Sequence, residues 1–117
     1  MNKIWIFLAL MCVGFTACSG DELMEEEMME EDDCADTNFT YTNDVKQILE
    51  SSCALSGCHN GQTSLPDYTN YDGIFAVSTR AASRVQSRSM PPASAGITLS
   101  DSDINTIVCW VENGAPE

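Results

Sequence analysis

The chain has 117 residues, of which 18 are acidic and 5 basic, and its formal net charge at pH 7 is −13. It carries no basic patch large enough to neutralise several phosphates, so nucleic-acid binding is disfavoured. Its length allows one small domain, and a core of that size commonly needs a disulfide, metal or cofactor to stabilise it.

The first residues have the pattern of an export signal. Lys3 precedes an apolar run that starts at Ile4 and ends at Phe15, too short for a membrane span. The segment Phe15-Thr16-Ala17-Cys18 then resembles the lipobox of bacterial lipoproteins. That resemblance implies that residues 1–17 are a lipoprotein signal peptide and that Cys18 is lipidated. The alternative is an ordinary cleavage site with a stray cysteine, or a retained anchor.

Residues 18–36 read as the lipidated cysteine followed by an acidic tether. Ten acidic residues and no basic one lie between Asp21 and Asp36, so like-charge repulsion favours an extended, solvated segment. A role in docking a basic partner or in export to the cell surface is the alternative to a spacer. Residues 37–117 form the domain, and their four basic and eight acidic residues leave a net charge of only −4.

Helical spacing appears at both ends of this domain. Val45, Ile48 and Leu49 predict a helix that starts after Thr42 or Asn43 and ends near residue 52. Residues 71–75 and 78–85 predict short helices, and residues 100–103 form a capping box that opens a helix ending at residues 113–114. Residues 56–66 and 87–96 read as loops. With no sustained strand alternation, the predicted fold class is all-α.

The segment Cys53-Ala54-Leu55-Ser56-Gly57-Cys58-His59 carries the chemistry. Two cysteines followed at once by a histidine is the order of groups that attaches a haem covalently, because the sulfurs add to its vinyl groups and the imidazole then ligates the iron. Four residues separate the cysteines here, where two are usual. We expect Gly57 to supply the left-handed torsion that this wider spacing needs.

The sixth iron ligand is inferred by elimination. His59 is the chain's sole histidine, so a second axial ligand has to be methionine, lysine, cysteine or solvent. Met90 is the only methionine in residues 37–117, and it precedes two prolines that stiffen the backbone. We therefore predict Met90 as the ligand; the alternative is a core filler in a proline-rich turn.

Together these features resemble a family. A helix, the cysteine–histidine segment, the Met-Pro-Pro loop and the terminal Trp110-Val111-Glu112-Asn113-Gly114-Ala115-Pro116 resemble small exported monohaem c-type cytochromes of Bacteroidetes-type bacteria. The resemblance implies a cytochrome c-like helical domain with one covalent haem c, held by Cys53 and Cys58 and ligated by His59 and Met90. It also implies that a carbonyl near Pro66 accepts the remaining N–H of His59.

Other residues have secondary predicted roles. Arg80, Arg84 and Arg88 share a four-residue spacing and would form a basic ridge, which could meet haem propionates or a partner or simply face solvent. Cys34 and Cys109 are an even pair in an exported protein, so we expect a disulfide, with two free thiols as the alternative. The expected pocket lining is apolar and aromatic, with a place in the general core as the alternative for each residue: Tyr68, Tyr71, Ile74, Phe75, Ile97, Leu99 and Trp110.

The sequence thus predicts an electron-transfer protein of the cell envelope rather than an enzyme. Its partners would be redox proteins, with the membrane reached through the lipid anchor. One alternative is a stapled or zinc-binding lipoprotein, in which Cys53, Cys58, His59 and either Cys34 or Cys109 form a Cys₃His site. The other is a haem enzyme or sensor, which needs Met90 off the iron and has no second histidine to act as an acid or base.

Overall fold

A computed structural model describes residues 34–117. The predicted signal peptide, the lipidated Cys18 and nearly all of the acidic tether therefore lie outside the described residues. Within residues 34–117 the chain forms helices and no strand, which confirms the all-α prediction. The elements are η1 (Cys34–Asp36), η2 (Tyr41–Val45), α1 (Lys46–Ser52), α2 (Tyr71–Phe75), α3 (Ser78–Gln86), η3 (Ala93–Ala95) and α4 (Asp101–Glu112).

The first helical segment begins earlier than its sequence suggests. Thr40, rather than Thr42 or Asn43, is the N-cap: its hydroxyl accepts from the Asn43 amide, and its own amide donates to Asp44 Oδ2 at 2.9 Å. This reciprocal pair satisfies two amides that a helix start otherwise leaves free. A wide π-helical turn, η2, leads directly into α1, which ends at Ser52 as predicted.

The two middle helices match the predicted segments. Asn70 caps α2 by accepting from the Gly73 amide at 2.9 Å. Gly73 is required there, because a Cβ at this position would lie 1.8 Å from the Asp67 carbonyl oxygen. Helix α3 extends to Gln86, one residue beyond the expected end.

Helix α4 begins and ends where the sequence indicates. Ser100 and Asp103 form the capping box, each side chain accepting from the other residue's amide. The helix stops before Gly114, whose φ of +90° suits glycine. The chain then folds back, and Trp110 Nε1 donates to the Pro116 carbonyl at 2.8 Å.

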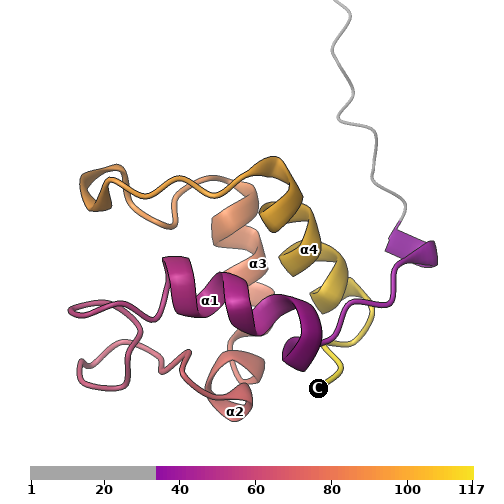
Figure 1. Cartoon of the computed structure of the whole chain (residues 1–117), viewed down its shortest axis with the longest axis horizontal. Coiled ribbons are helices and arrows are strands. Elements are labelled where there is room, and N and C mark those ends of the chain that lie inside the picture. The colour runs from indigo at the N-terminus through magenta and orange to yellow at the C-terminus, as the bar shows by residue number, and fades with distance from the viewer. Residues whose placement is uncertain (1–33) are drawn as a thin grey trace, which may run out of the picture.

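Helix packing leaves one side of the domain to the long loops. Helix α4 packs against α3 and against η2, while α2 contacts α3. The loops after α1 and after α3 extend to the same side, on the left of Figure 1. The core that joins the helices includes Tyr41, Val45, Leu49, Ile74, Ala81, Ala82, Val85, Leu99, Ile107, Trp110 and Ala115.

The N-terminal edge is fastened to α4 by the predicted cysteine pair. Cys34 and Cys109 form a disulfide in the structure, across a sequence separation of 75. Asn113 reinforces this junction, because its amide nitrogen lies 3.0 Å from both the Cys34 and the Thr37 carbonyl oxygens. Between residues 34 and 117, no helix has the length and apolar character that crossing a membrane requires.

Candidate functional site

The cysteine–histidine segment forms a compact loop at the end of α1. The Cys53 amide still donates to Leu49 within the last helical turn, and the His59 amide donates back to the Cys53 carbonyl at 3.1 Å. Gly57 has φ +79°, so the expected left-handed residue lies where the loop reverses. The extra two residues are therefore accommodated in a closed turn, and both thiols and the imidazole line the same cavity.

The His59 ring is held in one orientation. Its Nδ1 lies 2.8 Å from the Pro66 carbonyl oxygen, as the family resemblance implied. A carbonyl oxygen can only accept, so Nδ1 carries a proton and donates, and in the neutral form of the ring the free lone pair is on Nε2. Tyr68 stacks on a face of the His59 ring, with the two ring centroids 4.0 Å apart and the ring planes 5° from parallel. A preoriented imidazole with an unprotonated Nε2 is the form that ligates a metal.

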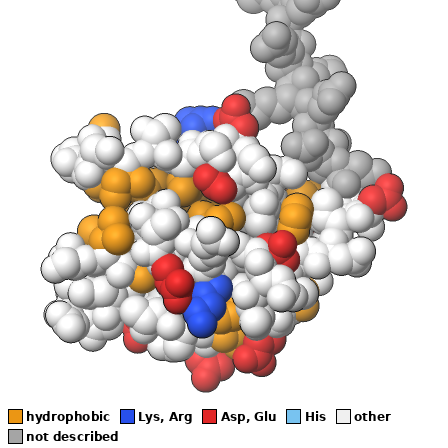
Figure 2. Space-filling view, viewed as in Figure 1, with side chains coloured by type: hydrophobic (Ala, Val, Ile, Leu, Met, Phe, Trp, Pro, Cys, Tyr) orange, Lys and Arg blue, Asp and Glu red, His pale blue; other side chains and the backbone are white. Residues whose placement is uncertain are grey.

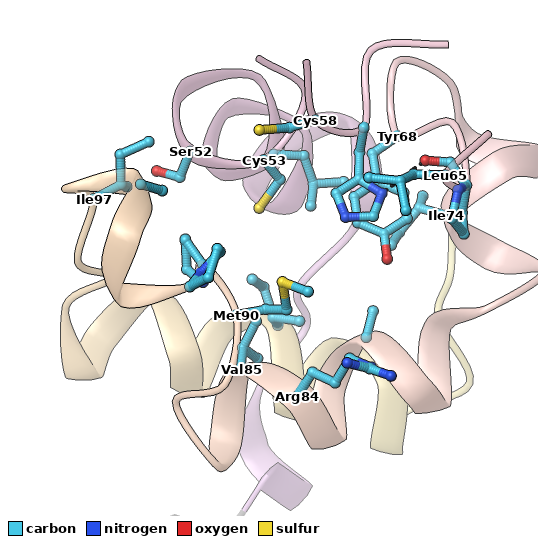
Figure 3. A pocket seen from close by; sticks show the side chains of 18 of the residues that line it. Ser52, Cys53, Cys58, Leu65, Tyr68, Ile74, Arg84, Val85, Met90 and Ile97 are labelled. Atoms are coloured by element: carbon cyan, nitrogen blue, oxygen red, sulfur yellow. Dashed lines mark hydrogen bonds between the residues drawn. The ribbon is translucent and has the colours of Figure 1, made fainter. Parts of the chain in front are cut away.

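Met90 reaches the cavity from the loop that follows α3. The Ser89 and Met90 amides both donate to the Arg84 carbonyl, at 2.9 and 3.2 Å, which fixes the start of this loop to the end of the helix. Figure 3 shows the Met90 sulfur directed into the cavity, on the opposite side from Cys53 and Cys58. The four residues predicted from two separate segments thus line one space.

The cavity itself is about 430 Å³ and is mostly apolar. In Figure 2 it corresponds to the hollow at the left of the molecule, where apolar side chains gather between the two loops. Its inner wall includes core residues that the sequence alone did not assign to a site: Val45, Leu49, Ala81, Val85 and Ile107.

Of the aromatic and aliphatic residues expected to line it, Tyr68, Ile74, Ile97 and Trp110 do so, and three do not. The Tyr71 hydroxyl instead donates to the Ala115 carbonyl at 2.9 Å. Phe75 packs against Tyr71 and is 48 % exposed. Leu99 lines a separate cavity of about 180 Å³ behind Met90.

The basic ridge is also only partly correct. Arg80 and Arg84 lie on α3 and line the cavity, but Arg88 follows the end of that helix with φ +55°. Its guanidinium pairs with Asp101 at the start of α4. Because Arg88 has a left-handed backbone, it does not continue the four-residue helical spacing. Its side chain therefore lies on a different surface from those of Arg80 and Arg84.

The two thiols are half-buried and unpaired. Burial, and then the neighbouring Cys58, raises the pKa of Cys53 to about 11. Burial also raises the pKa of Tyr68, with a smaller contribution from Cys53. Both effects arise because a low-dielectric site disfavours the charged form of an acid. At neutral pH Cys53 is therefore an uncharged thiol beside an uncharged phenol.

The Cys₃His zinc site is not assembled. It needs Cys34 or Cys109 as a fourth ligand, and their sulfurs are joined to each other. In the part of the chain that the structure describes, no three His, Cys, Asp or Glu side chains are grouped closely enough to hold a metal ion. His59 and Met90 form a different set of donors from the Cys₃His site. Met90 contributes a thioether, which is a weak, neutral ligand.

The chain matches no protein-family model, and neither a curated protein nor a solved structure is significantly similar to it. What the fold and the site define is a small helical, disulfide-linked domain with an apolar cavity lined by two thiols, one oriented imidazole and one thioether.

Proposed function

We propose that this protein transfers electrons by means of one covalently attached haem c, within a cytochrome c-like helical domain. The observation that carries the proposal is that Cys53, Cys58, His59 and Met90 line a single cavity. The thiols approach from one side and the thioether from the other, as Figure 3 shows.

The residues present fit such a group. The Pro66 carbonyl accepts a hydrogen bond from His59 Nδ1, which leaves Nε2 free to ligate iron. This orientation of the ring is present in the protein without any bound metal. The cavity volume lies within the range of small-molecule and cofactor sites, which is roughly 300–1,000 Å³. Its walls are apolar, as expected for a site that receives a flat aromatic macrocycle.

Each side chain has a distinct role in this proposal. Cys53 and Cys58 would hold the haem as thioethers, and His59 and Met90 would ligate its iron. When bound, haem c supplies a one-electron centre that alternates between ferrous and ferric iron. The apolar walls exclude water, which favours the less charged ferrous form.

A role as a carrier rather than an enzyme follows from the same residues. The sole histidine is committed to Pro66 and to the cavity, so no second imidazole is left to act as an acid or base. The Cys34–Cys109 disulfide supports an oxidising compartment. With the lipobox at Cys18, this supports a lipid-anchored protein of the cell envelope that exchanges electrons with other redox proteins there.

The test is covalent retention of haem. The chain is produced with a cytochrome c maturation system, denatured on a gel and stained for haem peroxidase activity. We expect a stained band at the mass of the polypeptide, and its loss in the double variant Cys53→Ala/Cys58→Ala. The control, Ser51→Ala/Ser56→Ala, changes two exposed residues beside the same segment and keeps the stain. An unstained wild-type band would contradict the proposal.

A further inference from the structure

Charge is unevenly distributed around the cavity. Residues 37–117 contain four basic and eight acidic side chains. Two of the four basic residues, Arg80 and Arg84, line the cavity, and none of the acidic residues does. In this acidic domain, the charged side chains that line the apolar cavity are therefore both positive.

Ion pairing sharpens this contrast. Outside the cavity, Lys46 lies 3.9 Å from Glu50, and Arg88 pairs with Asp101. The guanidinium groups of Arg80 and Arg84, by comparison, have neither an ion-pair nor a hydrogen-bond partner among residues 34–117. The only two unpaired basic side chains of the described domain are thus the two at the cavity.

Their placement on α3 brings both groups to one side of the cavity. Arg80 and Arg84 are four residues apart and share a helix face, while the adjacent Ala81 and Val85 are buried in the cavity wall. Figure 3 draws Arg84 beside Val85, across the cavity from Cys58.

We propose that Arg80 and Arg84 form a subsite for two carboxylate groups on a ligand whose apolar body fills the cavity. An apolar ligand without charge would cover two guanidinium groups and leave them poorly solvated and unpaired, which is unfavourable. The planar fork of arginine matches a carboxylate, and two such pairs satisfy both cations. This inference rests on the proposed function where the ligand is haem, whose two propionates are the carboxylates.

The first test uses the haem-loaded protein and compares Arg80→Gln, Arg84→Gln and Arg88→Gln. Glutamine keeps much of the length and polarity of arginine, and Arg88 provides a matched control outside the cavity. We expect the propionate bending bands of the resonance Raman spectrum to shift in the first two variants and to stay unchanged in the third. Haem attachment that persists with unshifted bands in all three variants would overturn the subsite and leave the proposed function intact.

The second test does not depend on attached haem or on iron. Metal-free protoporphyrin IX and its dimethyl ester are titrated against the wild-type chain produced without a maturation system, and binding is followed by porphyrin fluorescence. We expect the free acid to bind about tenfold more tightly than the ester, as the loss of charge-assisted hydrogen bonds predicts. The preference should disappear in Arg80→Gln/Arg84→Gln and persist in Arg88→Gln.

The outcomes of the two tests are distinguishable. A wild-type chain that retains no haem but prefers the free acid through Arg80 and Arg84 refutes the proposed function and supports the subsite. Equal binding of acid and ester, no binding of either, or equal loss in the Arg88→Gln control refutes the subsite.

Discussion

Removing the Cys34–Cys109 disulfide should cost this domain a large part of its stability. The bond closes a loop with a sequence separation of 75. In the chain-entropy model a loop of that length restricts the unfolded chain by about 4.5 kcal/mol at 25 °C. A domain of this size has a total free energy of unfolding of roughly 4–12 kcal/mol. The double variant Cys34→Ala/Cys109→Ala is therefore expected to be marginally folded.

The assay is urea unfolding of the wild type and the double variant, followed by helical circular dichroism. We expect a loss of about 3–4.5 kcal/mol and a larger m-value, because the unlinked chain exposes more surface when it unfolds. The Cys109 side chain is fully buried, so its truncation adds a small packing loss to the entropic one.

Asn113→Ala is the informative control. It removes the hydrogen bonds from the Asn113 side chain to Cys34 and Thr37 at the same junction, but leaves the covalent link. Its expected cost is about 1–2 kcal/mol with no change in the m-value, since it acts on the folded state alone. A disulfide variant that loses less than about 1 kcal/mol, or keeps the wild-type m-value, would refute the entropic reasoning.

Three further outcomes test the site and its support. Met90→Ala in the oxidised haem-loaded protein should abolish the weak far-red band of methionine–iron ligation; a spectrum that keeps the band removes Met90 from the iron. Gly57→Ala, at φ +79° with open space around it, should cost about 1–2 kcal/mol in urea unfolding, whereas Gly73→Ala should prevent folding because its Cβ overlaps the Asp67 carbonyl. The pKa of Cys53 is raised by burial from 9.0 to about 11, so the haem-free chain, with its Cys34–Cys109 disulfide intact and Cys53 as a free thiol, should lose up to about 2.7 kcal/mol as pH rises from 9 to 11. Urea unfolding at several pH values should show this loss, and Cys53→Ala or thioether formation should eliminate it.

Local chemistry explains what the sequence could predict. The capping box at Ser100 and Asp103 and the stop at Gly114 depend on residues close together in the chain, and both appear where expected. The same holds for the His59 bond to Pro66, which spans only seven residues.

What the sequence could not predict depends on contacts between distant segments. Tyr71 was expected in the cavity wall, but its hydroxyl donates a hydrogen bond to the Ala115 carbonyl, 44 residues away. Tyr71 therefore does not line the cavity. Arg88 had the spacing of a helical ridge, yet a left-handed backbone and Asp101 remove it from α3. In both cases the partner lies in the C-terminal part of the domain, and no local pattern identifies it.

The cavity and the hydrophobic core are largely the same set of residues. Val45, Leu49, Ile107 and Trp110 line the cavity and also belong to the hydrophobic core, in which η2 packs against α4. A domain this small would ordinarily fill such a space with side chains, because unfilled apolar volume forfeits packing contacts. Here the space is lined instead by two thiols, an oriented imidazole and a thioether. The ligand proposed for this site would therefore complete the core as well as carry the electron, so the haem-loaded protein should resist unfolding better than the haem-free chain.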